Sequence, residues 1–367
     1  MSTKRILIES LYLYPSNIGG PSKTIFDIAR ALSQKYDVTC LSTDGGITDE
    51  QLFGRWHSQE NFRCRYITSH SKLRVRFLMR AIPEIRKNDV IYLNSIFFVP
   101  SLIMGLVAIA LKRKIIWSPR GETFAIGNNA AKRFYVHLIH RIRKNIHFHA
   151  TTLQEEISIK ETIGQDIHTF VIPNYLDLPT PVNCKRAEKD YILFVGRVAP
   201  IKQLERLIDA LTLSKEFLRS DAEMLIAGPV EEKYRSYYRS LLKKIGDDSL
   251  SHKVKFVGNI KSPQKEVYYR NALVLVLPSK SENFGNVVLE ALSQGTPVIA
   301  THGTPWPELN DHQAGFWIDD SVNSIASALD ELLAFNESDR DMFSRNALEL
   351  SKLYSSEKTL PAWERQL

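Results

Sequence analysis

The sequence predicts an α/β protein built from two doubly wound domains. Short apolar runs with the composition of buried strands alternate with helical patterns along most of the chain, and this alternation is typical of a parallel sheet covered by helices on both faces. With 367 residues, the chain exceeds one ordinary hydrophobic core and fits two domains. Between residues 173 and 190 the periodicity stops at three prolines and a charged run, which indicates a linker.

The first apolar run, residues 5–9, contains Glu9. A carboxylate in the run, with no convincing small-residue cleavage pattern after it, favours a buried strand over a signal peptide. Gly19-Gly20-Pro21 predicts a turn, and apolar residues at helical spacing then predict a helix over residues 22–34 with Ser22 as its N-cap. Further strand-like runs of this half are residues 38–42, 90–93, 115–118 and 148–152.

Residues 97–111 form an apolar stretch that is too short for a bilayer span, which needs about 20 residues. Pro100 interrupts the stretch near its start. We therefore expect a strand end followed by a buried helix.

The alternation restarts after the linker. Strands are predicted at residues 191–195, 224–227, 255–257, 273–277 and 298–301, and helices at residues 203–213 and 287–294. The predicted organisation is an N-terminal acceptor-side domain over residues 1–177, a donor-binding domain over residues 190–345, and a helical segment over residues 346–367 that packs back toward the N-terminal domain. Because ligands bind at the carboxyl ends of strands in such folds, the site is expected in the cleft between the domains.

Composition indicates in which cellular compartment the protein works and which partners it needs. The net charge of +7 is modest for this length and does not demand a nucleic-acid partner. Cys40, Cys64 and Cys184 are few, odd in number and widely spaced, which suits a reducing, cytoplasmic compartment and leaves no zinc motif.

The basic excess lies in the N-terminal half. It forms two stretches, Lys72, Arg74, Arg76, Arg80, Arg86 and Lys87, and then Lys132, Arg133, Arg141, Arg143 and Lys144. Such stretches are most often solvated faces. The alternative is attraction to anionic lipid on the inner face of a membrane, worth about 1 kcal/mol for each basic residue near the surface.

The segment from Ser281 to Ala291 offers the richest chemistry. It follows a predicted strand, contains a glycine and leads into a helix near Asn286, whose free backbone N–H groups would bind an anion such as a diphosphate. Glu282 in the loop and Glu290 in the helix can accept hydrogen bonds from hydroxyls, which suits a sugar and a ribose. The alternative is that both glutamates are ordinary solvated residues.

A second segment, from Gly196 to Lys202, also follows a strand and precedes a helix. Arg197 and Lys202 could both reach a phosphate at the end of that strand. Taken singly, each is more often a solvated cation. Their position at the carboxyl end of a second strand in the same domain favours the phosphate interpretation.

Together these motifs resemble the retaining glycosyltransferases of family 4, whose GT-B fold has two Rossmann-like doubly wound domains facing across a central cleft. The resemblance covers most of the chain and is weak over residues 43–88. The matching segments are Gly196-Arg197 with Lys202, Ile226-Ala227-Gly228-Pro229, Val257-Gly258, Pro278-Ser279, the Glu282 and Glu290 pair with Phe284-Gly285, and Gly295-Thr296-Pro297-Val298-Ile299. Upstream, Gly19-Gly20, Ser118-Pro119-Arg120-Gly121, Ala150-Thr151-Thr152 and Ile172-Pro173-Asn174 also fit.

The resemblance implies roles for individual residues. Arg197 and Lys202 hold the donor diphosphate, Glu282 takes the hydroxyls of the donor sugar, and these three are the catalytic candidates. Glu290 takes the ribose hydroxyls. The remaining implied donor-binding residues are Gly19, Gly20, Gly196, Asn283, Phe284, Gly285 and Asn286. Gly19 and Gly20 would let the backbone approach the donor phosphates or the acceptor, because glycine has no Cβ to obstruct.

The chain departs from the family pattern in its N-terminal domain. Many members have a histidine before the glycine of the motif, whereas this chain has Arg120-Gly121-Glu122, as a Pro-Arg-Gly subset does. These three residues are therefore candidates for the N-domain side of the cleft, with roles left open.

The implied reaction is transfer of a hexosyl residue from a nucleotide diphosphate sugar to a surface glycan or a lipid-linked acceptor, with retention and with no metal and no cofactor. The rival hypotheses are a sugar-nucleotide epimerase on the same fold and a catalytically idle nucleotide-sugar-binding module.

Other enzyme classes fit poorly. A P-loop would need glycine where this chain has Asn17 and Ser22, and the G-x-G-x-x-G of dinucleotide oxidoreductases is absent after the first strand. His137, His140, His147 and His149 lack a carboxylate or cysteine at ligand spacing and are expected to be surface and core residues.

Overall fold

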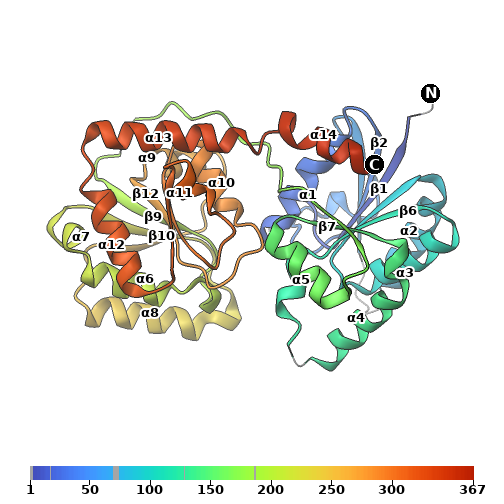
Figure 1. Ribbon diagram of the computed structural model, residues 1–367, viewed down its shortest axis with the longest axis horizontal. Helices are drawn as coiled ribbons and strands as arrows, with labels where there is room; N and C mark the ends of the chain where they lie inside the picture. Colours follow the sequence, from blue (N-terminus) through green and yellow to red (C-terminus); the bar gives the residue numbers. More distant parts are fainter. Residues whose placement is uncertain (1–2, 17, 69–73, 128, 186) are drawn as a thin grey trace. The chain divides into compact units, whose positions relative to one another are not determined.

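The protein folds into two α/β units (Figure 1), seen in a computed structural model that describes residues 3–16, 18–68, 74–127, 129–185 and 187–367. Unit 1 comprises Met1–Asp177 and Ser355–Leu367, and unit 2 comprises Leu178–Tyr354. Asn17 and Lys72 lie outside the described residues.

Unit 1 is built on an eight-stranded sheet with the order β3-β4-β2-β1-β5-β6-β7-β8. All neighbouring pairs are parallel except β3 and β4, an antiparallel edge pair in the region where no strand was predicted. The strands are β1 Arg5–Ser10, β2 Asp37–Thr43, β3 Trp56–Gln59, β4 Phe62–Ile67, β5 Val90–Asn94, β6 Lys114–Ser118, β7 His147–Ala150 and β8 His168–Val171. The strand order reverses between β1 and β5, which makes their carboxyl ends the switch point of this sheet.

Two apolar layers cover this sheet because alternate strand residues point to opposite faces. On β1, Leu7 packs with helices α2, α3, α4 and α5, whereas Ile6 and Ile8 pack with α1 and the C-terminal helix α14. The helices are α1 Gly19–Leu32, α2 Val75–Lys87, α3 Val99–Ala110, α4 Ala130–Ile142, α5 Leu153–Ile163 and α14 Ser356–Gln366, with short 3₁₀ turns at Glu50–Leu52, Glu122–Ala125 and Arg143–Asn145.

The start of α1 differs from the prediction. Gly19-Gly20-Pro21 is the first part of the helix and not a turn before it, and the N-cap is Ile18 instead of Ser22. A proline is tolerated there because the N–H groups of the first turn have no intrahelical partner to lose. Pro100 likewise stands in the first turn of the predicted buried helix, α3.

Unit 2 contains a six-stranded parallel sheet with the order β11-β10-β9-β12-β13-β14. This is the doubly wound order, with the switch point between β9 and β12. The strands are β9 Tyr191–Val195, β10 Glu223–Ala227, β11 Val254–Gly258, β12 Val274–Leu277, β13 Val298–Thr301 and β14 Gly315–Ile318. Each strand predicted in this half is present.

Helices lie on both faces of the unit 2 sheet: α6, α8 and α12 on one side, and α9, α10 and α13 on the other (Figure 1). Their bounds are α6 Leu204–Leu213, α7 Lys215–Arg219, α8 Arg235–Asp247, α9 Gln264–Asn271, α10 Asn286–Ser293, α11 Glu308–Asp311, α12 Val322–Leu333 and α13 Glu337–Lys352, with 3₁₀ turns at Pro200–Lys202 and Glu232–Tyr234.

The last two helices belong to different units. Because α13 is continuous through residue 346, the division falls after Tyr354 and not after residue 345. Helix α14 returns to unit 1, where Trp363 is buried with ring centroids 4.7 Å from His149 and 5.2 Å from Tyr92.

Candidate active site

The candidate site of unit 2 lies at the carboxyl edge of its sheet, around the switch point. The loops after β9, β12 and β13 are joined there by backbone hydrogen bonds. Lys280 N–H donates to the carbonyl of Ile201 at 2.9 Å, and Glu282 N–H donates to the carbonyl of Gly303 at 2.8 Å. The loops that carry the predicted donor residues are therefore one connected structure.

Glu282 and Lys202 meet in this structure. Lys202 Nζ forms an ion pair with Glu282 Oε1, and Ser279 Oγ donates to the same oxygen at 2.8 Å. The two charged side chains are 14% and 15% exposed, so water screens their charges only in part. The sequence placed both residues at the site but did not predict that they would pair.

Glycine at position 228 allows the loops after β9 and β10 to approach each other. Its φ is +149°, and a Cβ there would lie 1.8 Å from the carbonyl oxygen of Gly196. Gly196 N–H in turn donates to the carbonyl of Ala227 at 2.9 Å. The glycine motif at positions 226–229 thus has a steric cause, because any side chain at 228 would push the Arg197 loop away.

The segment before α10 is held by aromatic packing. Phe284 is buried, with its ring 5.1 Å from Trp306 and 5.7 Å from Tyr354, and Trp306 Nε1 donates to the Phe284 carbonyl at 2.5 Å. Gly285, with φ +80°, is the N-cap of α10, which begins at Asn286. Phe284 therefore positions the start of α10, and its buried side chain offers no surface to a ligand.

Arg197 has a different partner from Lys202. Its Nη1 donates to Glu231 Oε1 at 2.9 Å, and the arginine side chain is 48% exposed. Hydrogen bonds from Arg197 and Lys233 lower the pKa of Glu231. The sequence missed Glu231, which stands two residues beyond the glycine motif at 226–229.

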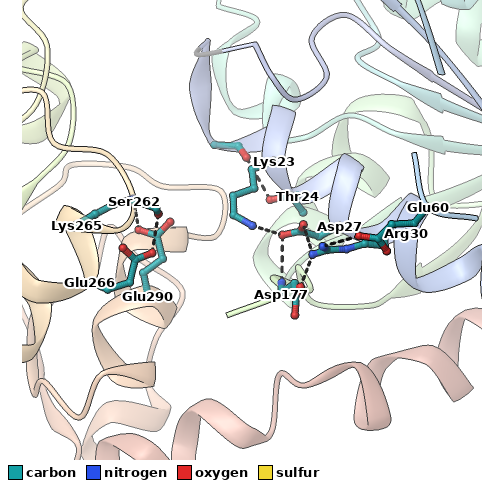
Figure 2. Close-up of polar contacts among 11 residues, drawn as sticks. Lys23, Thr24, Asp27, Arg30, Glu60, Asp177, Ser262, Lys265, Glu266 and Glu290 are labelled. Atoms are coloured by element: carbon teal, nitrogen blue, oxygen red, sulfur yellow. Dashed lines mark hydrogen bonds and ion pairs between the residues drawn. The ribbon is translucent and has the colours of Figure 1, made fainter. Parts of the chain in front are cut away.

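Glu290 belongs to a second polar cluster. Lys265 Nζ pairs with Glu290 Oε2 (Figure 2), and Tyr269 OH donates to the same oxygen at 2.8 Å. Both partners come from α9, which packs against α10. Sequence reasoning missed them, although their i, i+4 spacing on a helix would have placed them on one face.

In unit 1, Gly19 and Gly20 lie in the first turn of α1. Along the same helix, Lys23 Nζ donates to the buried Asp27 at 2.7 Å, and Asp27 also accepts from Arg30 at 3.2 Å (Figure 2). The backbone N–H of Asp177 donates to Asp27 at 3.1 Å, so this cluster ties α1 to the last residue before unit 2.

Arg120 is held within unit 1 by three acceptors. Its guanidinium donates to Asn94 Oδ1 at 3.1 Å, to Asn174 Oδ1 at 2.8 Å and to Tyr92 OH at 2.6 Å. Arg120 and Gly121 both have positive φ, +55° and +80°. This network fixes the guanidinium in place at the carboxyl edge of the unit 1 sheet.

Glu122 serves the loop after β5. Its carboxylate accepts from Ser95 Oγ at 2.7 Å and from the backbone N–H groups of Ile96 at 2.6 Å and Phe97 at 3.2 Å. Burial raises the pKa of Glu122, and these hydrogen bonds oppose that rise. The geometry gives Glu122 a structural task in unit 1.

The switch point of unit 1 holds a buried carboxyl group that the sequence did not single out as functional. Glu9 is inaccessible to solvent; its Oε2 accepts from Ser101 Oγ at 2.8 Å, while its Oε1 has no hydrogen-bond partner among the residues that the structure describes. Burial raises the pKa of Glu9 to about 8. Glu9 is therefore a mostly protonated group near neutral pH.

The histidines divide between core and surface. His149 is buried, contacts Tyr92 OH through Nδ1 at 2.9 Å and the carbonyl of Ile172 through Nε2 at 2.8 Å, and has its pKa lowered well below the ordinary value by burial.

Within the described ranges no group of three or more His, Cys, Asp or Glu could hold a metal ion. No helix of the described chain combines the length and apolar character needed to cross a bilayer.

Comparison with known proteins finds a family match in the C-terminal half of the chain. Residues 181–349 match the family model described as glycosyl transferases group 1. These residues form a group 1 glycosyltransferase domain. The match runs from before β9 into the last turn of α13 and contains the whole candidate site of unit 2.

Two curated glycosyltransferases match less than half of this chain. An uncharacterized glycosyltransferase of Methanocaldococcus jannaschii is 35% identical over 149 residues, which are 40% of this chain and 36% of that protein. A D-inositol 3-phosphate glycosyltransferase of Paenarthrobacter aurescens is 30% identical over 183 residues, 49% of this chain and 44% of that protein. The matched regions thus span less than half the length of these relatives.

Solved structures match over the whole chain and show the fold. HepE from Anabaena, in complex with UDP and glucose, superposes with a TM-score of 0.81, 16% identity and 99% coverage of both chains. Sucrose-phosphate synthase from Thermosynechococcus elongatus gives a TM-score of 0.78 at 20% identity, covering 99% of this chain and 98% of that one. The predicted GT-B fold, with two Rossmann-like domains and parallel sheets, is confirmed.

Proposed function

We propose that the chain is a hexosyltransferase that transfers a sugar from a nucleotide diphosphate sugar to a surface-glycan or lipid-linked acceptor. The observation that carries this proposal is the meeting of Lys202 and Glu282 at the switch point of the group 1 glycosyltransferase domain. A cation beside a carboxylate, next to the start of α10, offers one group for phosphate and one for sugar hydroxyls.

The donor class has support from the relatives. HepE is described in complexes with UDP and with UDP-glucose, and a donor of this type would suit the groups at the unit 2 switch point. In our proposal Lys202 and Arg197 hold the diphosphate, Glu282 accepts from the sugar hydroxyls and Glu290 accepts from the ribose. The backbone at Gly196, Asn283, Gly285 and Asn286 completes the donor-binding part of unit 2.

We further propose a retaining, same-face substitution, as in family 4. The bond from the anomeric carbon to the diphosphate oxygen breaks as the bond to the acceptor oxygen forms on the same face. The departing diphosphate oxygen takes the proton of the acceptor hydroxyl. Cations and the helix start offset the charge that develops on the leaving group, so we expect no metal and no cofactor to be required.

The acceptor proposal rests on relatives and on surface charge. WaaG, described as a glycosyltransferase involved in lipopolysaccharide biosynthesis, shares the fold with a TM-score of 0.69. Residues 123–154 include five lysines and arginines and no acidic residue, and on α4 Arg133, Arg141 and the apolar Phe134 are exposed. A cytoplasmic enzyme touching an anionic membrane surface through unit 1 would meet a lipid-linked acceptor there, and no nucleic acid is expected as a partner.

A thermal-shift screen followed by a turnover assay tests the proposal. UDP, GDP or ADP, or one of their sugars, should raise the melting temperature, because a ligand that binds only the folded chain stabilises it by mass action. Turnover of the donor should then require an acceptor with a free hydroxyl. Product formed without any acceptor would support the epimerase, and binding without turnover would support the idle binding module.

A further inference from the structure

We propose that Lys265 and Tyr269 are positioning residues that fix the Glu290 carboxylate for selective recognition of the donor ribose. The inference rests on the proposed function, since it assigns the donor nucleotide to unit 2. It starts from two contacts that Glu290 receives from the neighbouring helix α9, one from Lys265 (Figure 2) and one from Tyr269.

Both contacts fall on one oxygen of the carboxylate. Tyr269 OH donates to Glu290 Oε2 at 2.8 Å, and the ammonium of Lys265 pairs with the same atom. Within the described part of the chain, Glu290 Oε1 takes part in no hydrogen bond or ion pair, and it is not among the buried oxygens that lack a partner. The carboxylate is thus anchored at Oε2 and presents Oε1 as an acceptor for a ligand hydroxyl.

The anchors are themselves rigid. Tyr269 is 1% exposed, and its carbonyl accepts from Thr296 Oγ1 at 2.5 Å. Lys265 lies one helical turn earlier, with its ammonium 5.7 Å from the centre of the Tyr269 ring, and its side chain is 22% exposed. Burial raises the pKa of the Tyr269 hydroxyl, so the hydroxyl stays a hydrogen-bond donor at neutral pH.

An anchored acceptor discriminates between ligands more sharply than a mobile one. A charged hydrogen bond from a ribose hydroxyl to Oε1 would favour a ribonucleotide over the matching deoxynucleotide by about tenfold or more. If Glu290 lost its anchors, it would have to be ordered at each binding event, and part of that preference would disappear. A merely structural ion pair would change the melting temperature and leave the preference intact.

The experiment compares ribose and deoxyribose forms of one nucleotide. Whichever of UDP, GDP and ADP binds the wild-type chain most tightly is titrated by calorimetry, together with its 2′-deoxy and 3′-deoxy forms. The variants are Lys265→Met, Tyr269→Phe and Lys265→Arg, and the matched control is Lys261→Met, an exposed lysine just before α9.

We expect the ratio of deoxy to ribose Kd to fall at least threefold, about the loss of one partly ordered hydrogen bond, in Lys265→Met and in Tyr269→Phe. Lys265→Arg should retain most of the preference, and Lys261→Met all of it. Tyr269→Phe removes a single hydroxyl from a filled core, so it keeps the test valid if Lys265→Met fails to fold.

An unchanged ratio in both Lys265→Met and Tyr269→Phe, with the ribonucleotide still bound, overturns the inference and leaves the proposed function in place. An equal fall of this ratio in Lys261→Met also overturns the inference, because the loss of any positive charge near α9 would then have the same effect. If the wild-type chain binds none of the three nucleotides, the proposed function itself fails, and this inference fails with it.

Discussion

At the scale of single residues, Lys202 and Arg197 differ in solvent exposure and in the carboxylate that each contacts. Lys202 is mostly buried beside Glu282, whereas Arg197 is about half exposed and paired with Glu231. If both stabilise the leaving diphosphate, the loss of either removes a preorganised charge at the point where negative charge develops. We predict that Lys202→Ala and Arg197→Ala each lower kcat by about 10²–10³ and weaken donor binding.

Steady-state kinetics measures these losses, with Lys280→Ala as the control from the same loop region, since Lys280 is exposed. Glu282→Gln should also be severely impaired, and intact-mass spectrometry with slow donor analogues should show no glycosyl-enzyme in any variant. A stable hexose adduct on Glu282 or Glu122 would contradict the same-face substitution. Unchanged kcat in both alanine variants would remove these cations from the mechanism.

Glu9 gives a prediction about pH. Its folded pKa of about 8 lies above the ordinary value of 4.5. Between these two values the folded chain keeps a proton that the unfolded chain has released, so the stability due to neutral Glu9 is complete below pH 4.5 and is lost as pH rises toward 8. Glu9→Gln, which imitates the protonated acid, should remove this loss.

The advantage of Glu9→Gln over the wild type should therefore grow from pH 5 to pH 8 by about 1.4 kcal/mol for each pH unit. Urea unfolding at a series of pH values measures it, and Glu161→Gln, an exposed glutamate of α5, is the control. A difference between variant and wild type that is constant across this range would show that Glu9 titrates normally.

At the scale of elements, α14 is the clearest case of a segment whose place depends on packing. The buried side chain of Trp363 packs against the rings of Tyr92 and His149, and α14 lies with α1 on one side of the unit 1 sheet. We predict that Trp363→Ala destabilises unit 1 by about 3–5 kcal/mol, the usual cost of deleting a buried aromatic side chain.

Denaturant unfolding followed by probes in each unit checks this prediction. The transition of unit 1 should move to lower denaturant while that of unit 2 stays in place, and Trp363→Phe should recover much of the loss. An equal shift of both transitions would mean that α14 does not belong to unit 1 alone.

Elements also show where local reasoning works. Buried runs such as β9 and β13 have the bounds that their sequence predicted, because a strand covered on both faces is apolar at nearly every position. The start of α1 was misplaced, because two glycines and a proline suit a turn and a first helical turn almost equally well. The antiparallel pair of β3 and β4 was missed: β3 is four residues long and has no buried side chain, although β4 does alternate apolar and basic residues from Phe62 to Tyr66.

At the scale of the whole molecule, charge is distributed unevenly. The described basic residues of the acid-free stretch at 123–154 include the exposed Arg133 and Arg141 on α4. We predict that the chain binds anionic vesicles better than neutral ones. The binding should weaken with salt, because the Debye length falls from about 10 Å at 0.1 M to about 3 Å at 1 M.

Vesicle sedimentation measures this preference. A double variant, Arg133→Glu with Arg141→Glu, should lose most of the binding, whereas Lys243→Glu on α8 of unit 2 should keep it. Equal partitioning to neutral and anionic vesicles, or equal losses in the two variants, would reject a membrane surface on unit 1.

The sequence by itself determined the two-domain α/β fold, the positions of most strands, and the loops that carry Arg197, Lys202 and Glu282. These features depend on local composition and on spacing along the chain, which a sequence displays directly. Only the tertiary structure decided which groups meet: Lys202 with Glu282, Lys265 and Tyr269 with Glu290, Arg120 with its three acceptors, and Trp363 with the unit 1 core. The physical reason is that these partners lie on separate strands and helices, so their distances are set by sheet order and helix packing, and residue spacing carries no record of either.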